Sequence, residues 1–292
     1  MQKSYQLIEL YCAICYHYDT ALSAHAQRMS NNFCPKFSDE ECLATLIWGI
    51  ANQKYDVKRC YEFIQDYYGD WFPKLPSYQT YNKRICFLAD AFRELAGILL
   101  GGLGLDSSHA DFVYDSMPIV VANSARSGRA KVASELCNKG YCASKDMWYY
   151  GSKLHILAQC NYKAKPTPAQ MQISKASEHD RKIAEEMLSD VYDIRLFADM
   201  ALLDQQWQAK MLAENNVEIL TPIKRKKGQK VLPSVDKFLS SAISSVKQAV
   251  ESLNYWLIEK TNIQRASKVR SENGLTVFLF ARVACACLCF NC

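Results

Sequence analysis

Glycine and proline are scarce in this chain of 292 residues, with 11 and 8 copies. Such low numbers exclude a collagen-like protein and a scaffold made mainly of loops. Long hydrophobic runs are also missing. The most apolar stretch, residues 275–290, is shorter than the roughly 20 residues that span a bilayer, and it carries Arg282 near its middle. We therefore expect no membrane span and no membrane partner, and we interpret this stretch as a buried helix.

Three short signals are missing as well. Residues 1–10 lack a charged start followed by an apolar core, so we expect no export. The glycines of residues 101–104 are not followed by the Gly-Lys-Ser/Thr ending of a phosphate-binding loop, and no Gly-x-Ser-x-Gly nucleophile elbow occurs. The sequence therefore favours neither a nucleotide-binding loop nor a serine hydrolase.

Cysteine is plentiful but is not arranged for zinc. The chain has 13 cysteines, an odd number, which together with the missing export signal predicts free thiols in a reducing cytoplasm. Cys12 and Cys15 form a CxxC pair, but they fall on a predicted helix, and the cysteines of residues 285–292 lie in apolar sequence. A zinc ribbon needs two paired motifs on loops. We interpret the cysteines as buried thiols.

The first hundred residues have the periodicity of helices. Ser38 and Glu41 form a capping box in front of an apolar stripe, and two further helices are predicted over residues 55–68 and 78–100. Because the glycines of residues 101–104 then interrupt the pattern, we predict an all-helical N-terminal domain over residues 1–107.

Beyond residue 107 the pattern becomes mixed. Short β-branched or apolar runs alternate with helical periodicity in the order β-β-β-α-β-α-β-α. The expected strands are residues 112–121, 148–160, 170–174, 194–199 and 217–220, and the expected helices are residues 179–191, 205–215 and 243–260. The fold class is therefore α/β (α+β), with a mixed sheet flanked by helices over residues 108–292.

Positive charge is concentrated in one segment. The whole chain has 35 Lys and Arg against 30 Asp and Glu, a net charge of +5. Residues 220–270 hold eleven basic and three acidic residues, which is +8 and leaves −3 for the remainder. This favours a polyanionic partner, most simply nucleic acid, although a solvated loop beside a charged helix is the alternative. The expected phosphate contacts lie in a basic loop near residues 220–237 and are Lys224, Arg225, Lys226 and Lys227.

Three acidic residues stand out from their surroundings. Asp115 interrupts an apolar strand, where an unpaired carboxylate is costly to bury; Asp199 ends another such strand, and Glu251 lies on a late helix. Carboxylates gathered from separate elements need neutralising cations, and oxygen-only ligands suit Mg²⁺. Spacing alone leaves open that these are three unrelated surface acids. The order of the elements that carry them, however, is that of the ribonuclease-H-like fold.

At these residues the chain resembles the DDE transposases of bacterial insertion sequences. The matching segments, in chain order, are VYDSMPIVVAN, YYGSKLHILAQ, SKASEHD, LFADMALLD, ILTPIKRKK and KQAVESLNYW. Two upstream segments, FSDEECLATLIWG and WFPKLPSYQTYNKR, resemble the helical N-terminal part of one branch of these transposases. The resemblance therefore spans most of the chain and implies a ribonuclease-H-like catalytic domain behind a helical one.

The resemblance implies that Asp115, Asp199 and Glu251 form a catalytic, metal-binding triad. Two Mg²⁺ ions are the implied cofactor, for which Mn²⁺ can substitute, and no nucleotide is required. Two such ions can hold both the attacking and the leaving oxygen of a phosphoryl displacement. The implied function is transposition: hydrolysis of a phosphodiester at the ends of a mobile element and strand transfer into target DNA.

The surroundings of Glu251 depart from the family pattern. Where the family often has a tyrosine, an arginine and a downstream lysine, this chain has Ser244, Lys247 and Ile258. Only the basic position remains, and we expect Lys247 to contact DNA. Glu259 stays open as an alternative third ligand. A catalytically degenerate DNA-binding protein and a non-transposing nuclease of the same fold are the alternative functions.

The implied partners are double-stranded DNA, as terminal inverted repeats and as target, and a second copy of the chain in a homodimer on DNA. Residues 1–107 are expected to recognise the element's ends or to mediate dimerisation. The expected location is the bacterial cytoplasm, at the nucleoid when DNA is bound.

Other polar residues leave two interpretations open. Lys153 and His155 share one face of their predicted strand and either contact DNA phosphate or lie on an exposed face of the sheet. Asp180 is interpreted structurally, because an acid in the first turn of a helix suits the helix dipole. Arg265, Lys268 and Arg270 are basic residues for which exposure to solvent is the simple alternative.

Overall fold

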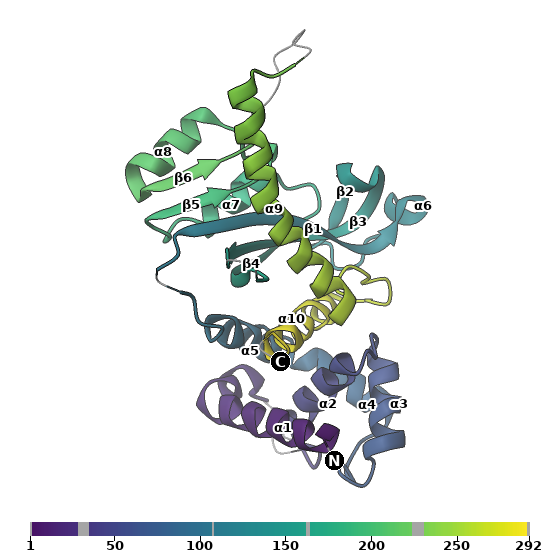
Figure 1. Ribbon diagram of the computed structural model, residues 1–292. Coiled ribbons are helices and arrows are strands. Elements are labelled where there is room, and N and C mark those ends of the chain that lie inside the picture. The colour runs from purple at the N-terminus through teal and green to yellow at the C-terminus, as the bar shows by residue number, and fades with distance from the viewer. Residues whose placement is uncertain (1, 29–34, 107, 162–163, 224–230, 291–292) are drawn as a thin grey trace. The chain divides into compact units, whose positions relative to one another are not determined.

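The computed structural model describes residues 2–28, 35–106, 108–161, 164–223 and 231–290 (Figure 1). The chain forms two compact units: unit 1 comprises residues 1–102 and 257–292, and unit 2 comprises residues 103–256. The sequence placed the boundary near residue 107 and assigned residues 257–292 to the second domain. In the structure these residues pack in unit 1 instead, because their helix is apolar around most of its circumference and is buried there.

Unit 1 is entirely helical in its described part. Its elements are α1 (Gln2–Thr20), the 3-10 helix η1 (Leu22–Ala26), α2 (Asp39–Ala51), α3 (Val57–Tyr68), α4 (Tyr78–Phe87), α5 (Ala89–Gly101), the last residues of α9 (Ser234–Thr261) and α10 (Glu272–Leu288). The predicted capping box is present at the start of α2, where the Ser38 side chain accepts a hydrogen bond from the Glu41 amide. The single helix predicted over residues 78–100 is two helices, because the backbone leaves the helical region at Leu88.

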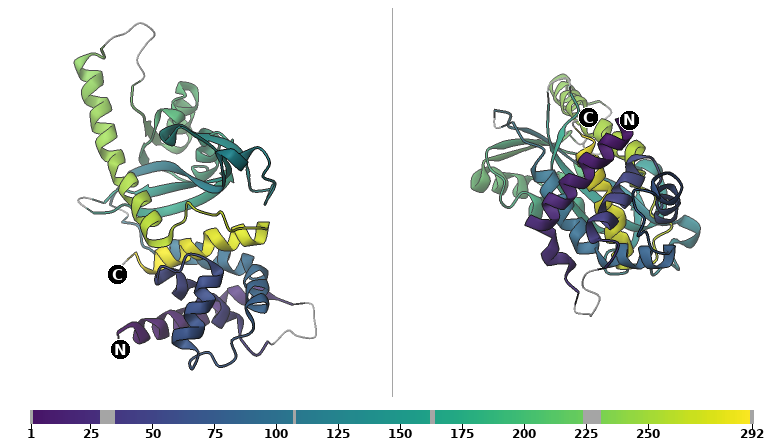
Figure 2. Two further views of the ribbon diagram at one scale, coloured as in Figure 1. Left: turned by 90° about the vertical axis from the view of Figure 1, so that its right-hand side faces the viewer. Right: turned by 90° about the horizontal axis from the view of Figure 1, so that it is seen from below.

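The C-terminal helix α10 belongs to the core of unit 1. Figure 2 shows it in yellow next to the blue helices of the N-terminal part. Its side chains Leu275, Leu279 and Ala284 are fully buried, next to elements that include α5 and α2. Within the described ranges, no helix combines the length and the apolar character that crossing a membrane demands.

Unit 2 is built on a six-stranded mixed sheet. The strands are β1 (Asp111–Asn123), β2 (Asn138–Cys142), β3 (Met147–Gln159), β4 (Thr167–Lys175), β5 (Ile194–Phe197) and β6 (Val217–Leu220). Their order is β2-β3-β1-β5-β6, with β4 also paired to β3; β1, β5 and β6 are parallel to one another, whereas the remaining pairings are antiparallel. This arrangement confirms the expected ribonuclease-H-like sheet. Strand β2 was not predicted, because its five residues show no clear alternation.

The two faces of the sheet have different coverings. Tyr114 and Leu157, which are paired across β1 and β3, are buried in one cluster with apolar residues of α7 (Asp180–Met187) and α8 (Gln205–Asn215). Asp115, one residue further along β1, faces the opposite side because successive side chains of a strand alternate. On that side it meets α9, which crosses β1 in Figure 1. Three short elements, α6 (Ser124–Ser127), η2 (Ala143–Lys145) and η3 (Met200–Leu202), lie in the connections.

Candidate active site

Asp115 and Asp199 are brought together by parallel pairing of β1 with β5. The register ends with Val113 paired to Phe197; two residues further on, Asp115 still lies in β1, whereas Asp199 lies just beyond the end of β5. Neighbouring strands lie about 4.8 Å apart, so the two carboxylates project from adjacent backbone positions. Asp199 lies two residues after the end of β5 and is the N-cap residue of the 3-10 helix η3, where its side chain makes no capping hydrogen bond. Its carboxylate is therefore available to the neighbouring groups.

The environment of Asp115 disfavours its negative charge. Burial raises the pKa of the Asp115 carboxyl from 3.8 to about 6; the charge of Lys247 opposes this rise, and the charge of Asp199 adds to it. A carboxylate near a second carboxylate in a partly dry site is stabilised by an added cation. The donor set is thus suited to a positively charged ligand.

Helix α9 contacts both carboxylates through one face. The Lys247 ammonium forms an ion pair with Asp199 Oδ1, and Asn254 Nδ2 donates a 2.7 Å hydrogen bond to Asp115 Oδ2. These two residues are seven positions apart, two turns of the helix, and so lie on the same side of it. Between them on the helix, Val250 and Leu253 are fully buried. The sequence reasoning missed Asn254, although its position among Val250, Leu253 and Leu257 marks a polar residue on a buried face.

The third acidic residue does not join this pair. Glu251 is exposed, one turn beyond Lys247, and no ion pair links it to a cation of the described chain. Among the described residues, no three His, Cys, Asp or Glu side chains gather closely enough to hold a metal ion. The alternative ligand, Glu259, lies in unit 1, where its carbonyl accepts a hydrogen bond from the Tyr55 hydroxyl.

Asp115 and Asp199 suit a divalent cation, but they form only part of a metal site. Asp115 and Asp199 supply oxygen-only donors that repel each other, which is the ligand chemistry of Mg²⁺ and Mn²⁺. The Lys247 ammonium already provides one positive charge at Asp199. A metal ion there therefore competes with Lys247, and a complete three-carboxylate site requires Glu251 to approach.

Lys153 and His155 lie on the other face of the sheet. They pair in register with Pro118 and Ser116, so their side chains project with Ser116 and away from Asp115. Lys153 Nζ is 2.6 Å from Asp180 Oδ1, and it also donates to the Glu178 carbonyl. The Lys153 ammonium is thus paired with Asp180. The contact with DNA that the sequence predicted for Lys153 stays a prediction.

Asp180 is the centre of a half-buried polar network. Its carboxylate accepts hydrogen bonds from Ser116 Oγ, at 2.9 Å, and from Lys153. Its carbonyl accepts from the Tyr114 hydroxyl, which also lies 2.6 Å from His155 Nδ1. Burial lowers the pKa of His155, so this imidazole is neutral at pH 7. Asp180 therefore ties α7 to β1 and β3, which goes beyond the helix-dipole role expected from the sequence.

The remaining predicted DNA contacts divide into two groups. Lys224, Arg225, Lys226 and Lys227 lie outside the described residues. Lys247 is described and is only 6% exposed, because its side chain is buried beside Asp199.

Comparison with models of known protein families gives a match. A family model described as "Transposase DDE domain" matches residues 107–267, more than half of the chain. A search of curated proteins returned no match. The matched range includes Asp115, Asp199 and Glu251 together with the whole sheet of unit 2.

Proposed function

Because the chain belongs to the transposase DDE domain family, we propose that it cleaves DNA at the ends of a mobile element and joins them to target DNA. The bacterial insertion-sequence origin is part of this proposal. The observation that carries it is the placement of Asp115 in β1 and of Asp199 just beyond the end of the adjacent parallel strand β5, with Lys247 beside them.

The proposed chemistry assigns a role to each side chain. Asp115, Asp199 and Glu251 hold the metal, with Mg²⁺ as the natural ion and Mn²⁺ as a substitute. Bound divalent ions lower the pKa of water and neutralise charge on the oxygens of an in-line phosphoryl displacement. Asn254 orients Asp115 through its amide. Lys247 neutralises Asp199 before DNA arrives and is then free to contact a phosphate.

DNA is the proposed substrate in two forms, the terminal inverted repeats and the target. The basic residues Lys224–Lys227 supply phosphate contacts, as the charge of this segment suggests. A homodimer on DNA would allow both ends of an element to be held at once. Recognition of the ends, or dimerisation, is assigned to the helical N-terminal residues 1–107 on the resemblance alone.

A second candidate function is favoured by a specific observation. Glu251 is exposed. Asp199 is ion-paired with Lys247, and Asp115 accepts a hydrogen bond from Asn254. A DNA-binding protein that has lost catalysis accounts for this arrangement without any rearrangement. The two functions differ in one property, since only the enzyme cuts DNA when a metal is added.

The test is metal-dependent cleavage of DNA that carries the flanking ends of the gene. Wild type is compared with Asp115→Asn and Asp199→Asn, each checked for folding and DNA binding, and with Asp190→Asn as a matched control that changes an exposed acid of unit 2. The proposal expects cutting by wild type and the control, and none by the two variants. Binding of the ends without cutting, in Mg²⁺ or Mn²⁺, contradicts it and favours the degenerate protein. Cutting without joined products favours a non-transposing nuclease.

A further inference from the structure

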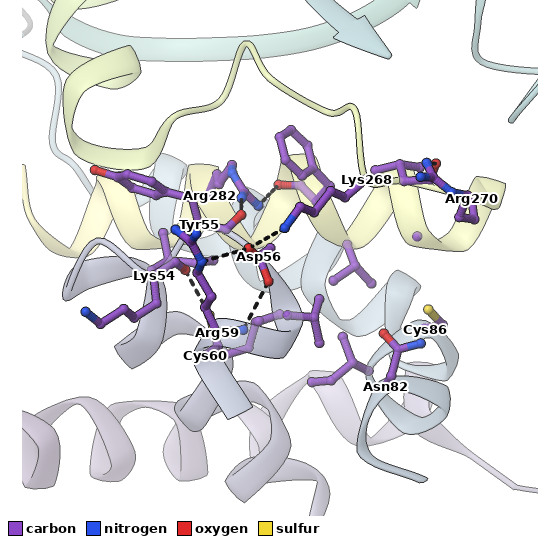
Figure 3. A pocket seen from close by; sticks show the side chains of 18 of the residues that line it. Lys54, Tyr55, Asp56, Arg59, Cys60, Asn82, Cys86, Lys268, Arg270 and Arg282 are labelled. Atoms are coloured by element: carbon purple, nitrogen blue, oxygen red, sulfur yellow. Dashed lines mark hydrogen bonds and ion pairs between the residues drawn. The ribbon is translucent and has the colours of Figure 1, made fainter. Parts of the chain in front are cut away.

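Unit 1 contains a cavity of about 490 Å³ that the proposed chemistry does not use (Figure 3). Its walls come from α2, α3, α4, α10 and the segment between α9 and α10, all of which belong to unit 1. Its volume falls within the roughly 300–1,000 Å³ typical of sites for small ligands. The cavity is therefore large enough to admit one nucleotide.

The lining of this cavity is strongly cationic. Its described residues include one acidic residue, Asp56, and six basic ones: Lys54, Arg59, Arg265, Lys268, Arg270 and Arg282. Asp56 is already paired, because its carboxylate lies 2.9 Å from Lys268 Nζ and 3.5 Å from Arg59 Nε. Figure 3 shows Asp56 between these two side chains. The cavity thus keeps an excess of positive charge that its own carboxylate does not neutralise.

Arg282 is a buried cation without a carboxylate partner in the described chain. It is 4% exposed, and its guanidinium donates hydrogen bonds to the carbonyls of Thr261, Phe278 and Tyr55. These carbonyls satisfy N–H groups but supply no full negative charge to pair with the guanidinium. Burying a charge in this way is costly, and an anion in the cavity reduces the cost. A positive charge placed at the wall of a cavity therefore points to an anionic ligand.

Arg265 and Arg270 add two more cations at the exposed side. Neither lies within ion-pair distance of a carboxylate among the residues that the structure describes, and both are exposed. Arg270 bonds only to the carbonyls of Ser267 and Val269. The sequence left solvent exposure as the alternative for these residues, but together with Lys268 they border a recess instead of a flat surface.

Aromatic side chains complete the lining. Tyr55, Tyr78 and Phe278 are half-buried in the wall, together with apolar residues such as Val277. The Arg282 guanidinium covers one face of the Phe278 ring, with Cζ 3.6 Å from its centre. Cationic grooves with aromatic side chains are the combination that binds unpaired nucleotides, since phosphates contact the cations and bases stack on the rings.

We propose that this cavity binds one unpaired nucleotide of a DNA strand. Arg265, Lys268 and Arg270 hold its phosphates, and the base lies against the aromatic wall. The backbone of an intact duplex cannot place a base in a recess, which is why an unpaired nucleotide is favoured over duplex DNA. This goes beyond the proposed function, because it assigns a non-catalytic DNA site to unit 1.

The test is equilibrium binding of a fluorescent single-stranded oligonucleotide to the full chain in the presence of a chelator. Without metal no DNA is cut, so the result is independent of the catalytic proposal. The double variant Arg265→Gln/Arg270→Gln is compared with Lys74→Gln/Lys83→Gln, which removes the same charge from exposed positions of unit 1 outside the cavity. We expect the cavity variant to bind about tenfold more weakly and its log-log salt slope to fall by about 1.4, roughly 0.7 for each lost contact. The control should stay within about twofold of wild type, because the two lost charges do not line the cavity and are screened by salt.

Two further measurements make the proposal refutable. An oligonucleotide that carries 5-iodouracil should crosslink on irradiation to a peptide containing Phe278 or Tyr55, and Phe278→Leu should weaken this crosslink. A duplex of the same sequence should bind with no difference between the cavity variant and the control. Equal weakening of both double variants, equal dependence of duplex binding on Arg265 and Arg270, or binding of a mononucleotide but not of the strand would each overturn the proposal.

Discussion

Lys247 of α9 is ion-paired with Asp199, which lies two residues after the end of β5, inside unit 2. The lysine is buried, whereas the Asp199 side chain is 61% exposed. Together with the hydrogen bond from Asn254 to Asp115, this pair holds α9 against the two strands that carry the aspartates. The same helix that neutralises the site also carries Glu251, so a small change in α9 alters both the charge and the ligand set.

Replacing Lys247 should increase metal affinity. In Lys247→Met the ammonium no longer competes for Asp199, and because the Asp199 side chain is largely exposed, the lost ion pair is worth about 1 kcal/mol or less. We therefore expect Mn²⁺ to bind up to about fivefold more tightly in calorimetric titration. Lys210→Met, which removes an exposed lysine of unit 2, serves as the control. Weaker Mn²⁺ binding in Lys247→Met would show that the lysine supports the site and does not compete with the metal.

Asn254 should position Asp115. Removing its amide in Asn254→Ala frees the Asp115 carboxylate to rotate, so we expect cleavage to fall by about 10–100-fold, the usual effect of losing a partner of a metal ligand. Gln248→Ala changes an exposed amide on the same helix and should leave the rate nearly unchanged. Equal rates for Asn254→Ala and wild type would contradict the positioning role.

Asp39 should make unit 1 sensitive to acid. It is buried between Arg28 and Arg84; burial alone raises its pKa, but the hydrogen bonds and charges of both arginines outweigh burial and hold the pKa below 3.8. A carboxyl whose pKa is lower in the folded than in the unfolded protein stabilises the fold at every pH above its unfolded-state pKa. This stabilisation is lost as the pH falls through the folded-state pKa.

We therefore expect Asp39→Asn to destabilise the protein by about 3 kcal/mol at pH 7, as for a broken buried ion pair. The difference from wild type in urea unfolding should shrink below pH 4. A difference that stays constant down to pH 2 would exclude this linkage.

Gly151 should be irreplaceable in β3. A Cβ at this position would lie 1.9 Å from the Ile119 carbonyl oxygen, a backbone atom of the neighbouring strand, so Gly151→Ala must force β1 and β3 apart. We expect loss of the folded sheet or a drop of more than about 3 kcal/mol in unfolding free energy. Gly97→Ala, on an exposed position of α5 with open space for the methyl group, should instead stabilise by up to about 1 kcal/mol. Similar melting temperatures for the two variants would refute this account.

The sequence predicted five of the six strands of the sheet and singled out Asp115 and Asp199, whose role as metal ligands stays a prediction. Alternation around Asp115 and the apolar run before Asp199 are local signals, and parallel pairing of β1 with β5 follows from the fold class they indicate. The pairing of Lys247 with Asp199 was not predictable, since it depends on where α9 docks. Likewise, α10 has apolar side chains around most of its circumference, so its sequence alone does not indicate which unit it packs in. The break between α4 and α5 at Leu88 was also not predicted, because the stripe of apolar residues continues through it.

The central claim, that Asp115 and Asp199 hold a catalytic metal, is tested most directly by changing the ligand atom. In Asp199→Cys a thiolate replaces the carboxylate, and soft sulfur suits a transition metal better than it suits Mg²⁺. We predict no cleavage of end-bearing DNA in Mg²⁺ and partial recovery in Mn²⁺, while Asp199→Ala stays inactive in both. Full activity of Asp199→Cys and Asp199→Ala in Mg²⁺ would contradict the claim.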